Sequence, residues 1–341
     1  MIARSPHSTN PEPWKRALAE AVTDPAELIA LLELDPTLIP GARRAAEAFG
    51  LRVPRGFLAR MRRGDPADPL LRQILPISAE GEEHPGFGPD PLGELDVERG
   101  PGLLQKYAGR ALVVATPACA VHCRYCFRRH FPYSAQRPPA DPTRALAPLA
   151  DDPTIREVIL SGGDPLSLDD DKLARWLAAA DALEHVRRIR VHTRYPIVLP
   201  ERVTDTLIDL LSRCRATPVI VVHANHGAEI DATTRRALVK LGCHGRVRMF
   251  NQAVLLRGVN DDSDSLAQLS EALFEADVLP YYLHRLDPVR GAAHFDVPEA
   301  QARALFADLL SRLPGYLVPR LVEERPGHPS KTPLAPSRDG L

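Results

Sequence analysis

Short apolar runs alternate with helical patterns over the last two thirds of the chain. Six runs rich in aliphatic and β-branched residues are predicted to be strands: Ala111–Thr116, Glu157–Ser161, Arg188–Thr193, Pro218–His223, Arg246–Asn251 and Pro280–Arg285. Apolar residues recur at helical spacing between and after them, near residues 142–151, 169–183, 201–213, 229–241, 263–277 and 298–313. This regular alternation predicts a parallel sheet built from βα units.

The predicted strands are continuous apolar runs, which indicates that both faces of the sheet are covered. Right-handed βα crossovers in series favour a barrel. A closed barrel of this kind has eight strands, whereas the pattern provides six and a short seventh at Tyr316–Val322. We therefore predict an α/β fold of the partial, three-quarter, (β/α)6 TIM-barrel type, with a doubly wound sheet as the alternative.

The first hundred residues are predicted to be a helical extension and a connector. From Pro11 to Arg63 the pattern is helical, and Thr23-Asp24-Pro25 is typical of a helix start, with a polar cap before proline. Residues 64–100 are rich in Pro, Gly, Asp and Glu, and residues 1–10 are expected to be a disordered lead. We divide the chain into an extension and connector (1–100), the partial barrel (101–315) and a C-terminal segment (316–341).

Each predicted strand ends in residues that can bind or react. In order along the chain these ends are a cysteine loop, Ser161-Gly162-Gly163-Asp164, His192-Thr193-Arg194, His223-Ala224-Asn225-His226, Asn251-Gln252 and Asp287. In a βα barrel the carboxyl ends of the strands carry the active site. The pattern therefore predicts an active site at this rim.

The cysteine loop is the strongest chemical signal. Cys119, Cys123 and Cys126 follow the first strand with C-x3-C-x2-C spacing. A structural zinc site needs four protein ligands, and three thiolates on an iron–sulfur cluster would leave one iron open to another ligand. A zinc site completed from elsewhere in the chain and a surface loop without a metal are the alternatives, and Cys214 and Cys243 are expected to be inert thiols.

Composition excludes several classes of function. The chain has 341 residues, a net charge of −1 and a pI near 6.9, so no overall field attracts nucleic acid or an anionic membrane. No run approaches the roughly 18 apolar residues of a membrane span. Five cysteines and an N-terminus without the apolar core of a signal peptide favour the reducing cytosol. We expect a cytoplasmic protein with no membrane or nucleic-acid partner.

The cysteine loop after the first strand of a partial barrel resembles the radical S-adenosylmethionine (SAM) superfamily. In that superfamily three cysteines hold a [4Fe–4S] cluster, and the fourth iron binds SAM. The resemblance implies a cluster on Cys119, Cys123 and Cys126. The segment formed by Ser161, Gly162, Gly163 and Asp164 resembles the glycine-rich segment that contacts the methionyl amino group, although a Gly-Gly pair alone is typical of a turn.

Longer segments resemble one branch, the lysine 2,3-aminomutases. These segments span residues 119–133, 251–261, 280–287, 291–295 and 327–334, and the match extends over roughly residues 11–335. Arg52-Val-Pro-Arg55, Asp68-Pro-Leu-Leu-Arg-Gln73 and the short tail resemble the EpmB (YjeK) type in particular. That subgroup makes (R)-β-lysine for attachment to elongation factor P.

The resemblance implies a role for particular side chains. Lys331 matches the lysine that carries pyridoxal 5′-phosphate (PLP), and Arg110 and Tyr107 match residues beside that cofactor. Arg128 matches the arginine that pairs with the substrate carboxylate, and Asp287 and Glu324 match the acidic pair that holds the distal ammonium, with glutamate replacing an aspartate at the second position. His223 and Gln252 match residues near SAM. Without the resemblance, Lys331 and Arg128 would be read as solvated side chains, and His223 and Gln252 as internally satisfied polar groups.

The implied activity is conversion of L-lysine to (R)-β-lysine through abstraction of a hydrogen atom from C3. It implies an electron donor of the flavodoxin or ferredoxin type, a link to elongation factor P and its β-lysine ligase, and a possible homo-oligomer. Two alternatives remain: a radical SAM enzyme of another class, such as an RNA-modifying or activating enzyme without PLP, and a metal-binding scaffold without catalysis.

Overall fold

One open sheet dominates the protein. The computed structural model describes residues 12–243 and 247–336, and within them ten strands pair in chain order. The parallel strands are β3 (Arg110–Thr116), β4 (Glu157–Gly162), β5 (Arg188–Thr193), β6 (Thr217–Val222), β7 (Arg248–Val254), β8 (Leu279–His284) and β9 (Arg320–Glu323). The two edge strands of this described sheet do not pair, so the partial barrel is open. The doubly wound alternative is wrong, because the strand order never reverses.

The predicted strands are confirmed with shifted ends. The short seventh begins at Arg320 rather than Tyr316 because Gly315–Leu317 forms a 3-10 turn first. Three short antiparallel strands were not predicted: β1 (Glu98–Gly100), β2 (Leu103–Tyr107) and β10 (Thr332–Pro333). Glycine and proline residues lie next to these strands in the sequence, and such residues are typical of a connector. The predicted lead at 1–10 and the predicted strand start at Arg246 lie outside the described residues.

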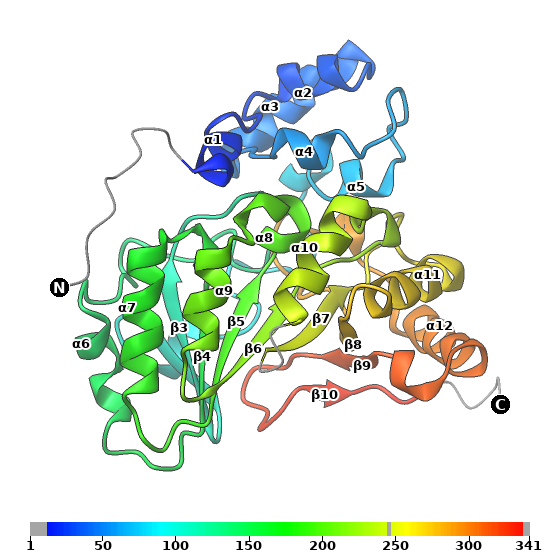
Figure 1. Cartoon of the computed structure of the whole chain (residues 1–341). Coiled ribbons are helices and arrows are strands. Elements are labelled where there is room, and N and C mark those ends of the chain that lie inside the picture. Colours follow the sequence, from blue (N-terminus) through cyan, green and yellow to red (C-terminus); the bar gives the residue numbers. More distant parts are fainter. Residues whose placement is uncertain (1–11, 244–246, 337–341) are drawn as a thin grey trace.

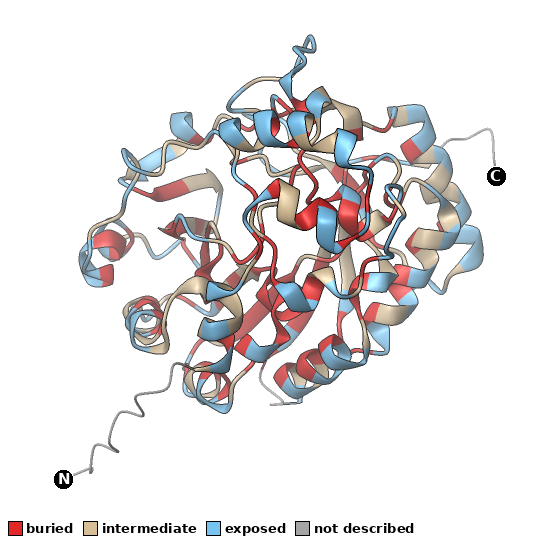
Figure 2. Cartoon of the chain, turned by 90° about the horizontal axis from the view of Figure 1, so that it is seen from above, coloured by how far each residue is buried: buried red, intermediate tan, exposed pale blue. Residues whose placement is uncertain are grey.

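Helices cover the outer face of the barrel (Figure 1). They are α6 (Pro142–Leu146), α7 (Asp170–Asp181), α9 (Asp205–Ser212), α10 (Ala232–Gly242), α11 (Ser263–Phe274) and α12 (Glu299–Arg312). Side-chain caps start most of them; Asp169, for example, accepts a 2.8 Å hydrogen bond from the Lys172 amide. Figure 2 shows the central strands mostly buried and exposed residues on the outward helix faces. No helix in the described part of the chain is both long and apolar enough to span a membrane.

The N-terminal extension lies over one end of the barrel, beside α8 (Tyr195–Val198) and α10 (Figure 1). It contains α1 (Pro13–Ala19), α2 (Pro25–Leu31), α3 (Ile39–Ala48), α4 (Arg55–Leu58) and α5 (Pro69–Arg72), and the cap on Asp24 confirms the predicted helix start. Arg60 ties the extension to the rim by donating to the carbonyl oxygens of Ile197 at 2.7 Å and Glu229 at 2.8 Å. The division into three segments remains a prediction. Strands of the two flanking segments join the barrel sheet: β1 from the first, and β9 and β10 from the last.

Candidate active site

The carboxyl ends of the parallel strands surround one cavity of about 470 Å³. Every residue that the sequence assigned to a cluster, cofactor or substrate lines it: Tyr107, Arg110, Cys119, Cys123, Cys126, Arg128, Ser161, Gly162, Gly163, Asp164, His223, Gln252, Asp287, Glu324 and Lys331. These residues come from β2, β3, β4 and β7, from the loops and segments after the strands, and from the C-terminal segment. The structure thus brings together positions that are more than 200 residues apart in the chain.

The cysteine loop forms one wall of the cavity. Cys119, Cys123 and Cys126 are free thiols. Burial raises the pKa of Cys119 well above its usual range and that of Cys126 to about 11, so these two thiols need a cationic centre to become ligands. No described group of three His, Cys, Asp or Glu residues surrounds a single ion position. All three thiols line the cavity, and in a cluster each would bind a separate iron.

Gly163 brings the end of β4 against the cysteine loop. A Cβ atom at this position would lie 2.4 Å from the carbonyl oxygen of Ala118 and 2.6 Å from the carbonyl carbon of Pro117. The preceding Gly162 has φ +120°, a conformation that favours glycine. The Gly-Gly pair is therefore required by close packing and backbone shape, which explains its position beside the thiols.

The N-terminal extension holds the cysteine loop through buried arginines, a role that the sequence did not reveal. Arg124 is fully buried and donates to Glu80 at 2.8 and 2.5 Å and to the carbonyl oxygen of Phe49 at 2.7 Å. Arg129 donates to the same Glu80 carboxylate at 2.6 Å. The amide of Arg124 also donates to the carbonyl oxygen of Gln73 at 2.9 Å. The loop is thus fixed from residues 49–80 as well as from the barrel.

Asp164 lies in the segment expected to contact SAM, but its carboxylate is hydrogen-bonded to the end of the next strand, β5. Its carboxylate accepts hydrogen bonds from Thr193 Oγ1 at 2.8 Å and from the amide of Arg194 at 2.6 Å. Burial nevertheless raises the pKa of Asp164 to about 6. Asp164 therefore fixes the geometry between β4 and β5. The backbone of the Gly-Gly pair, rather than this carboxylate, is left to contact a ligand in the cavity.

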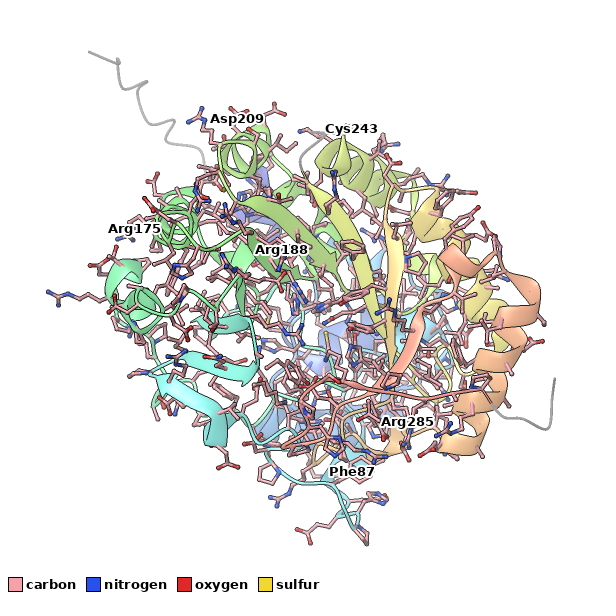
Figure 3. All side chains as sticks on the ribbon, turned by 90° about the horizontal axis from the view of Figure 1, so that it is seen from below. Phe87, Arg175, Arg188, Asp209, Cys243 and Arg285 are labelled. Atoms are coloured by element: carbon pink, nitrogen blue, oxygen red, sulfur yellow. The ribbon has the colours of Figure 1, made fainter. Side chains whose placement is uncertain are left out.

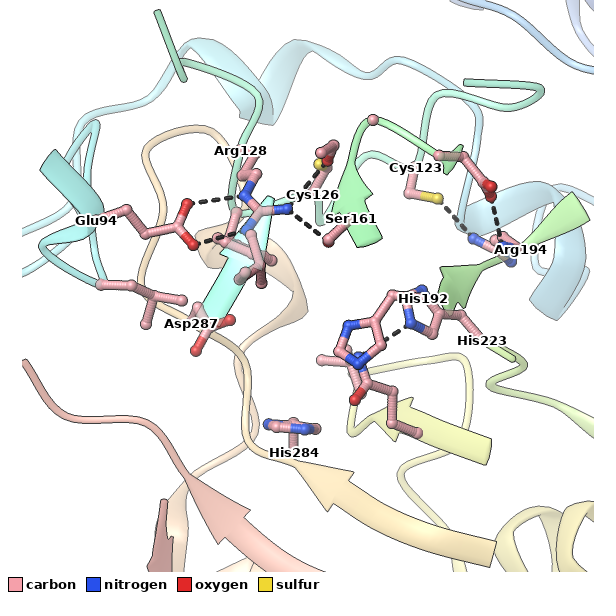
Figure 4. A pocket seen from close by; sticks show the side chains of 18 of the residues that line it. Glu94, Cys123, Cys126, Arg128, Ser161, His192, Arg194, His223, His284 and Asp287 are labelled. Atoms are coloured by element: carbon pink, nitrogen blue, oxygen red, sulfur yellow. Dashed lines mark hydrogen bonds and ion pairs between the residues drawn. The ribbon is translucent and has the colours of Figure 1, made fainter. Parts of the chain in front are cut away.

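Three histidines face the cavity, from β5, from the end of β6 and from β8 (Figure 4). Nε2 of His223 lies 3.0 Å from Nε2 of Gln252, so these two predicted residues form one polar unit. Burial lowers the pKa of His223 to about 3 and those of His192 and His284 below their usual range, so all three are neutral. The Nε2 atoms of His192 and His284 have no hydrogen-bond partner among the described residues. The sequence gave His192 no particular role and did not identify His284.

Arg128 is already paired within the protein. Glu94 accepts from its Nε at 2.8 Å and its Nη2 at 2.7 Å, while its Nη1 donates to Ser161 Oγ at 2.9 Å and to the carbonyl oxygen of Gly162 at 3.1 Å (Figure 4). Burial lowers the pKa of Arg128, but the Glu94 charge outweighs it and holds that pKa above its usual range. Glu94 lies in the predicted connector, where neither periodicity nor a motif distinguishes it.

Two lysines and a glutamate bridge the open side of the barrel. Glu324 follows β9, and its carboxylate accepts from Lys106 on β2 at 2.6 Å and from Lys331, which precedes β10. Burial alone would raise the pKa of Glu324, but the two lysines hold it well below its usual range. Arg110 lies 4.5 Å from the centre of the Tyr107 ring at the base of the same opening. Lys106 was not among the predicted site residues.

Asp287 faces the cavity near this bridge (Figure 4). Burial and the neighbouring charge of Glu324 raise the pKa of Asp287 to about 7, against the opposing effect of Lys331 and Lys106. No hydrogen bond to its carboxylate is found among the described residues. A buried carboxylate with a raised pKa is suited to a cationic ligand, because the ligand's charge would offset the desolvation.

A cavity with three thiols at the first rim position of a partial barrel defines a radical SAM enzyme. The radical SAM superfamily model matches residues 113–240. The chain is similar to "L-lysine 2,3-aminomutase" of Escherichia coli, 49% identical over 326 residues, which are 95% of this chain and 94% of that protein. It is 41% identical to the protein of the same name from Haemophilus influenzae over 335 residues, 97% of this chain and 98% of that one.

A more distant relative, the L-lysine 2,3-aminomutase of Acetoanaerobium sticklandii, is 32% identical over 95% of this chain and 78% of its own length. The chain belongs to the radical SAM lysine 2,3-aminomutase family and is an isomerase. Enzymes of this family use a [4Fe–4S] cluster, SAM and PLP. The donor set of the cavity fits these groups: thiols for iron, cationic side chains for a phosphate, and an accessible lysine amine.

Proposed function

We propose that this protein converts L-lysine to (R)-β-lysine, with PLP bound at Lys331, and that the product is attached to elongation factor P. One observation carries the proposal: the three thiols, Lys331, Arg128 and the acidic residues Asp287 and Glu324 line the same cavity. Both ends of a lysine molecule would find an opposite charge there, which favours a zwitterionic amino acid with a cationic side chain as the substrate.

Three groups of residues would bind the cofactors. Cys119, Cys123 and Cys126 would bind the cluster, and the Ser161–Asp164 segment with His223 and Gln252 would bind SAM. Lys331, Arg110 and Tyr107 would bind PLP, with the guanidinium near the phosphate. When bound, these cofactors supply the removal and return of a hydrogen atom and a carrier for the migrating amino group.

The chain's own residues would hold lysine at both ends. Four of the five N–H groups of Arg128 are used by Glu94, Ser161 and Gly162, so a substrate carboxylate would take the remaining Nη2 N–H or displace Glu94. At the other end, Asp287 and Glu324 carry two negative charges when Asp287 is ionised, and Lys106 carries one positive charge. Once Lys331 carries the cofactor, the net charge of −1 matches one substrate ammonium.

Other parts of the proposal concern the cell. The electron donor is of the flavodoxin or ferredoxin type, the β-lysine ligase consumes the product, and the chain forms a homo-oligomer. The free thiols around the cavity favour the reducing cytosol. The similarity to the E. coli protein over 95% of this chain supports the activity.

The test is an anaerobic assay of the chain reconstituted with iron, sulfide and PLP, supplied with SAM, reductant and L-lysine. We expect β-lysine of R configuration, separated by chiral chromatography, and no product from L-ornithine at the same concentration. Failure to form β-lysine while SAM is cleaved would contradict the proposed activity. The link to elongation factor P is tested separately by the intact mass of that protein in cells lacking this chain, where the β-lysine increment should disappear.

A further inference from the structure

A buried guanidinium contacts one of the three cluster cysteines. Arg194 follows β5, is 5% exposed, and its Nη1 lies 2.7 Å from Cys123 Sγ and 2.5 Å from the Tyr125 hydroxyl (Figure 4). The sequence placed Arg194 at the rim but gave it no role. A guanidinium is always protonated, so it brings a permanent positive charge to this sulfur.

The position of Arg194 is fixed from its other side. Its Nη2 donates to Glu229 Oε2 at 2.8 Å and to Gln73 Oε1 at 2.7 Å. Glu229 is fully buried and accepts further hydrogen bonds from Gln73 Nε2 at 3.1 Å and from the Asn225 amide at 2.8 Å. The pair is therefore a buried dipole whose positive end contacts Cys123 and whose negative end lies on the far side of the guanidinium.

The contact distinguishes Cys123 from the other two cysteines. Among the described residues, neither Cys119 Sγ nor Cys126 Sγ has a hydrogen bond from a cationic side chain. Arg128 is adjacent in space, but its N–H groups are directed to Glu94, Ser161 and Gly162. A direct hydrogen bond from a cationic side chain is thus placed on one corner of the expected cluster, while the Arg128 guanidinium acts on the other two thiols only through space.

We propose that the Arg194–Glu229 dipole sets the reduction potential of the [4Fe–4S] cluster through Cys123, so that both are tuning residues of the radical-generating step. Adding one electron makes the cluster more negative, and a nearby positive charge or a hydrogen bond to a cysteine sulfur stabilises that reduced form. Arg194 therefore raises the potential and eases electron transfer from the donor. Glu229 partly cancels this charge and holds the guanidinium in position.

The test is an EPR-monitored redox titration of the cluster in the reconstituted full chain, without SAM or lysine. Arg194→Gln should make reduction about tenfold less favourable at a given potential, which for one electron corresponds to a midpoint lower by about 59 mV. Glu229→Gln should shift the midpoint in the opposite direction, because it leaves the guanidinium charge unbalanced. Opposite signs distinguish tuning from general disruption of the site.

Arg202→Gln is the matched control. Arg202 is also fully buried and paired with a carboxylate, Asp170 at 2.7 Å, but it does not line the cavity. Its variant should lose stability without a shift in midpoint. If Arg194→Gln binds no cluster, the titration of Glu229→Gln serves as the test, and a raised midpoint in that variant supports the proposal. An unchanged midpoint in either loaded variant, or shifts of the same sign in both, overturns it.

Discussion

The two sides of the cavity use charge differently. On the cysteine side, buried guanidiniums pair with buried carboxylates: Arg124 and Arg129 with Glu80, Arg128 with Glu94, and Arg194 with Glu229. On the open side of the barrel, Lys106 and Lys331, with 15% and 20% of their side chains exposed, share the carboxylate of Glu324. Asp287, also on the open side, has no hydrogen-bond partner for its carboxylate among the described residues.

The difference is one of burial and rigidity. Buried arginine–carboxylate pairs are costly to rearrange, so the cysteine side is preorganised before any ligand arrives. The lysines and the unpaired carboxylate of the open side can change partners if a cofactor binds Lys331 and an ammonium binds nearby. The cysteine side is thus suited to generating the radical, and the open side to exchanging cofactor and substrate.

The largest effect is expected from Cys123→Ala, which disables the cysteine side alone. It removes one of three cluster ligands, so SAM cleavage should be lost completely, as measured by 5′-deoxyadenosine formation. PLP absorbance should persist, because the open side is untouched. Cys243→Ala is the control, since this exposed thiol lies at the outer surface (Figure 3). Undiminished cleavage in Cys123→Ala would contradict the assignment.

The converse change is Lys331→Ala, which disables the open side alone. β-Lysine formation should fall below detection and the visible absorbance of lysine-bound PLP should disappear, while the cluster retains its EPR signal. Lys172→Ala, at an exposed lysine on α7, should change neither. Retention of the PLP absorbance in Lys331→Ala would show that another residue carries the cofactor.

The sequence predicted the thiols and the parallel strands, but not the charged partners on either side of the cavity. The three thiols have a diagnostic spacing, and the parallel strands have an apolar pattern set by burial. Lys106 lies on a five-residue strand that follows Gly100-Pro101-Gly102 and resembles a connector. Glu94 and Glu80 are ordinary acidic residues until their buried partners are known. Pairings between distant residues leave no local pattern, so only the folded chain reveals them.

Asp287→Asn should weaken substrate binding, an effect intermediate in size between those of the other variants. Loss of a charged hydrogen bond costs about 1.5–3 kcal/mol, so the KM for lysine should rise by about 10- to 100-fold. Because the pKa of Asp287 is raised to about 7, its carboxylate ionises as the pH rises through neutrality. The KM of the unmodified chain should therefore fall between about pH 6 and 8, and the variant should lose this dependence.

The same variant should change stability and lysine binding in opposite directions. A carboxyl whose pKa is raised from 3.8 to about 7 on folding stabilises the protein below pH 3.8, and this contribution is lost as the pH rises toward 7. At about pH 8 Asp287→Asn should accordingly melt at a higher temperature than the unmodified chain while binding lysine more weakly. A variant that both melts earlier and binds as well as before would contradict the account of Asp287.

The smallest effect is expected from Gly163→Ala on the cysteine side. Its Cβ would meet backbone atoms of Pro117 and Ala118 within 2.7 Å, so the free energy of unfolding should fall by about 1–3 kcal/mol. Iron content after reconstitution should fall with it, because the shifted segment carries Cys119. Gly56→Ala is the control, since a Cβ there meets nothing within 4 Å. Equal melting temperatures for the two variants would contradict the packing role of Gly163.

We expect both sides of the cavity to act on one lysine molecule. An experiment that follows deuterium from C3-labelled L-lysine during anaerobic turnover of the reconstituted chain with SAM and PLP tests this directly. We expect deuterium in 5′-deoxyadenosine and in the β-lysine product, detected by mass spectrometry. Unlabelled 5′-deoxyadenosine, formed at the same rate with and without lysine, would contradict it.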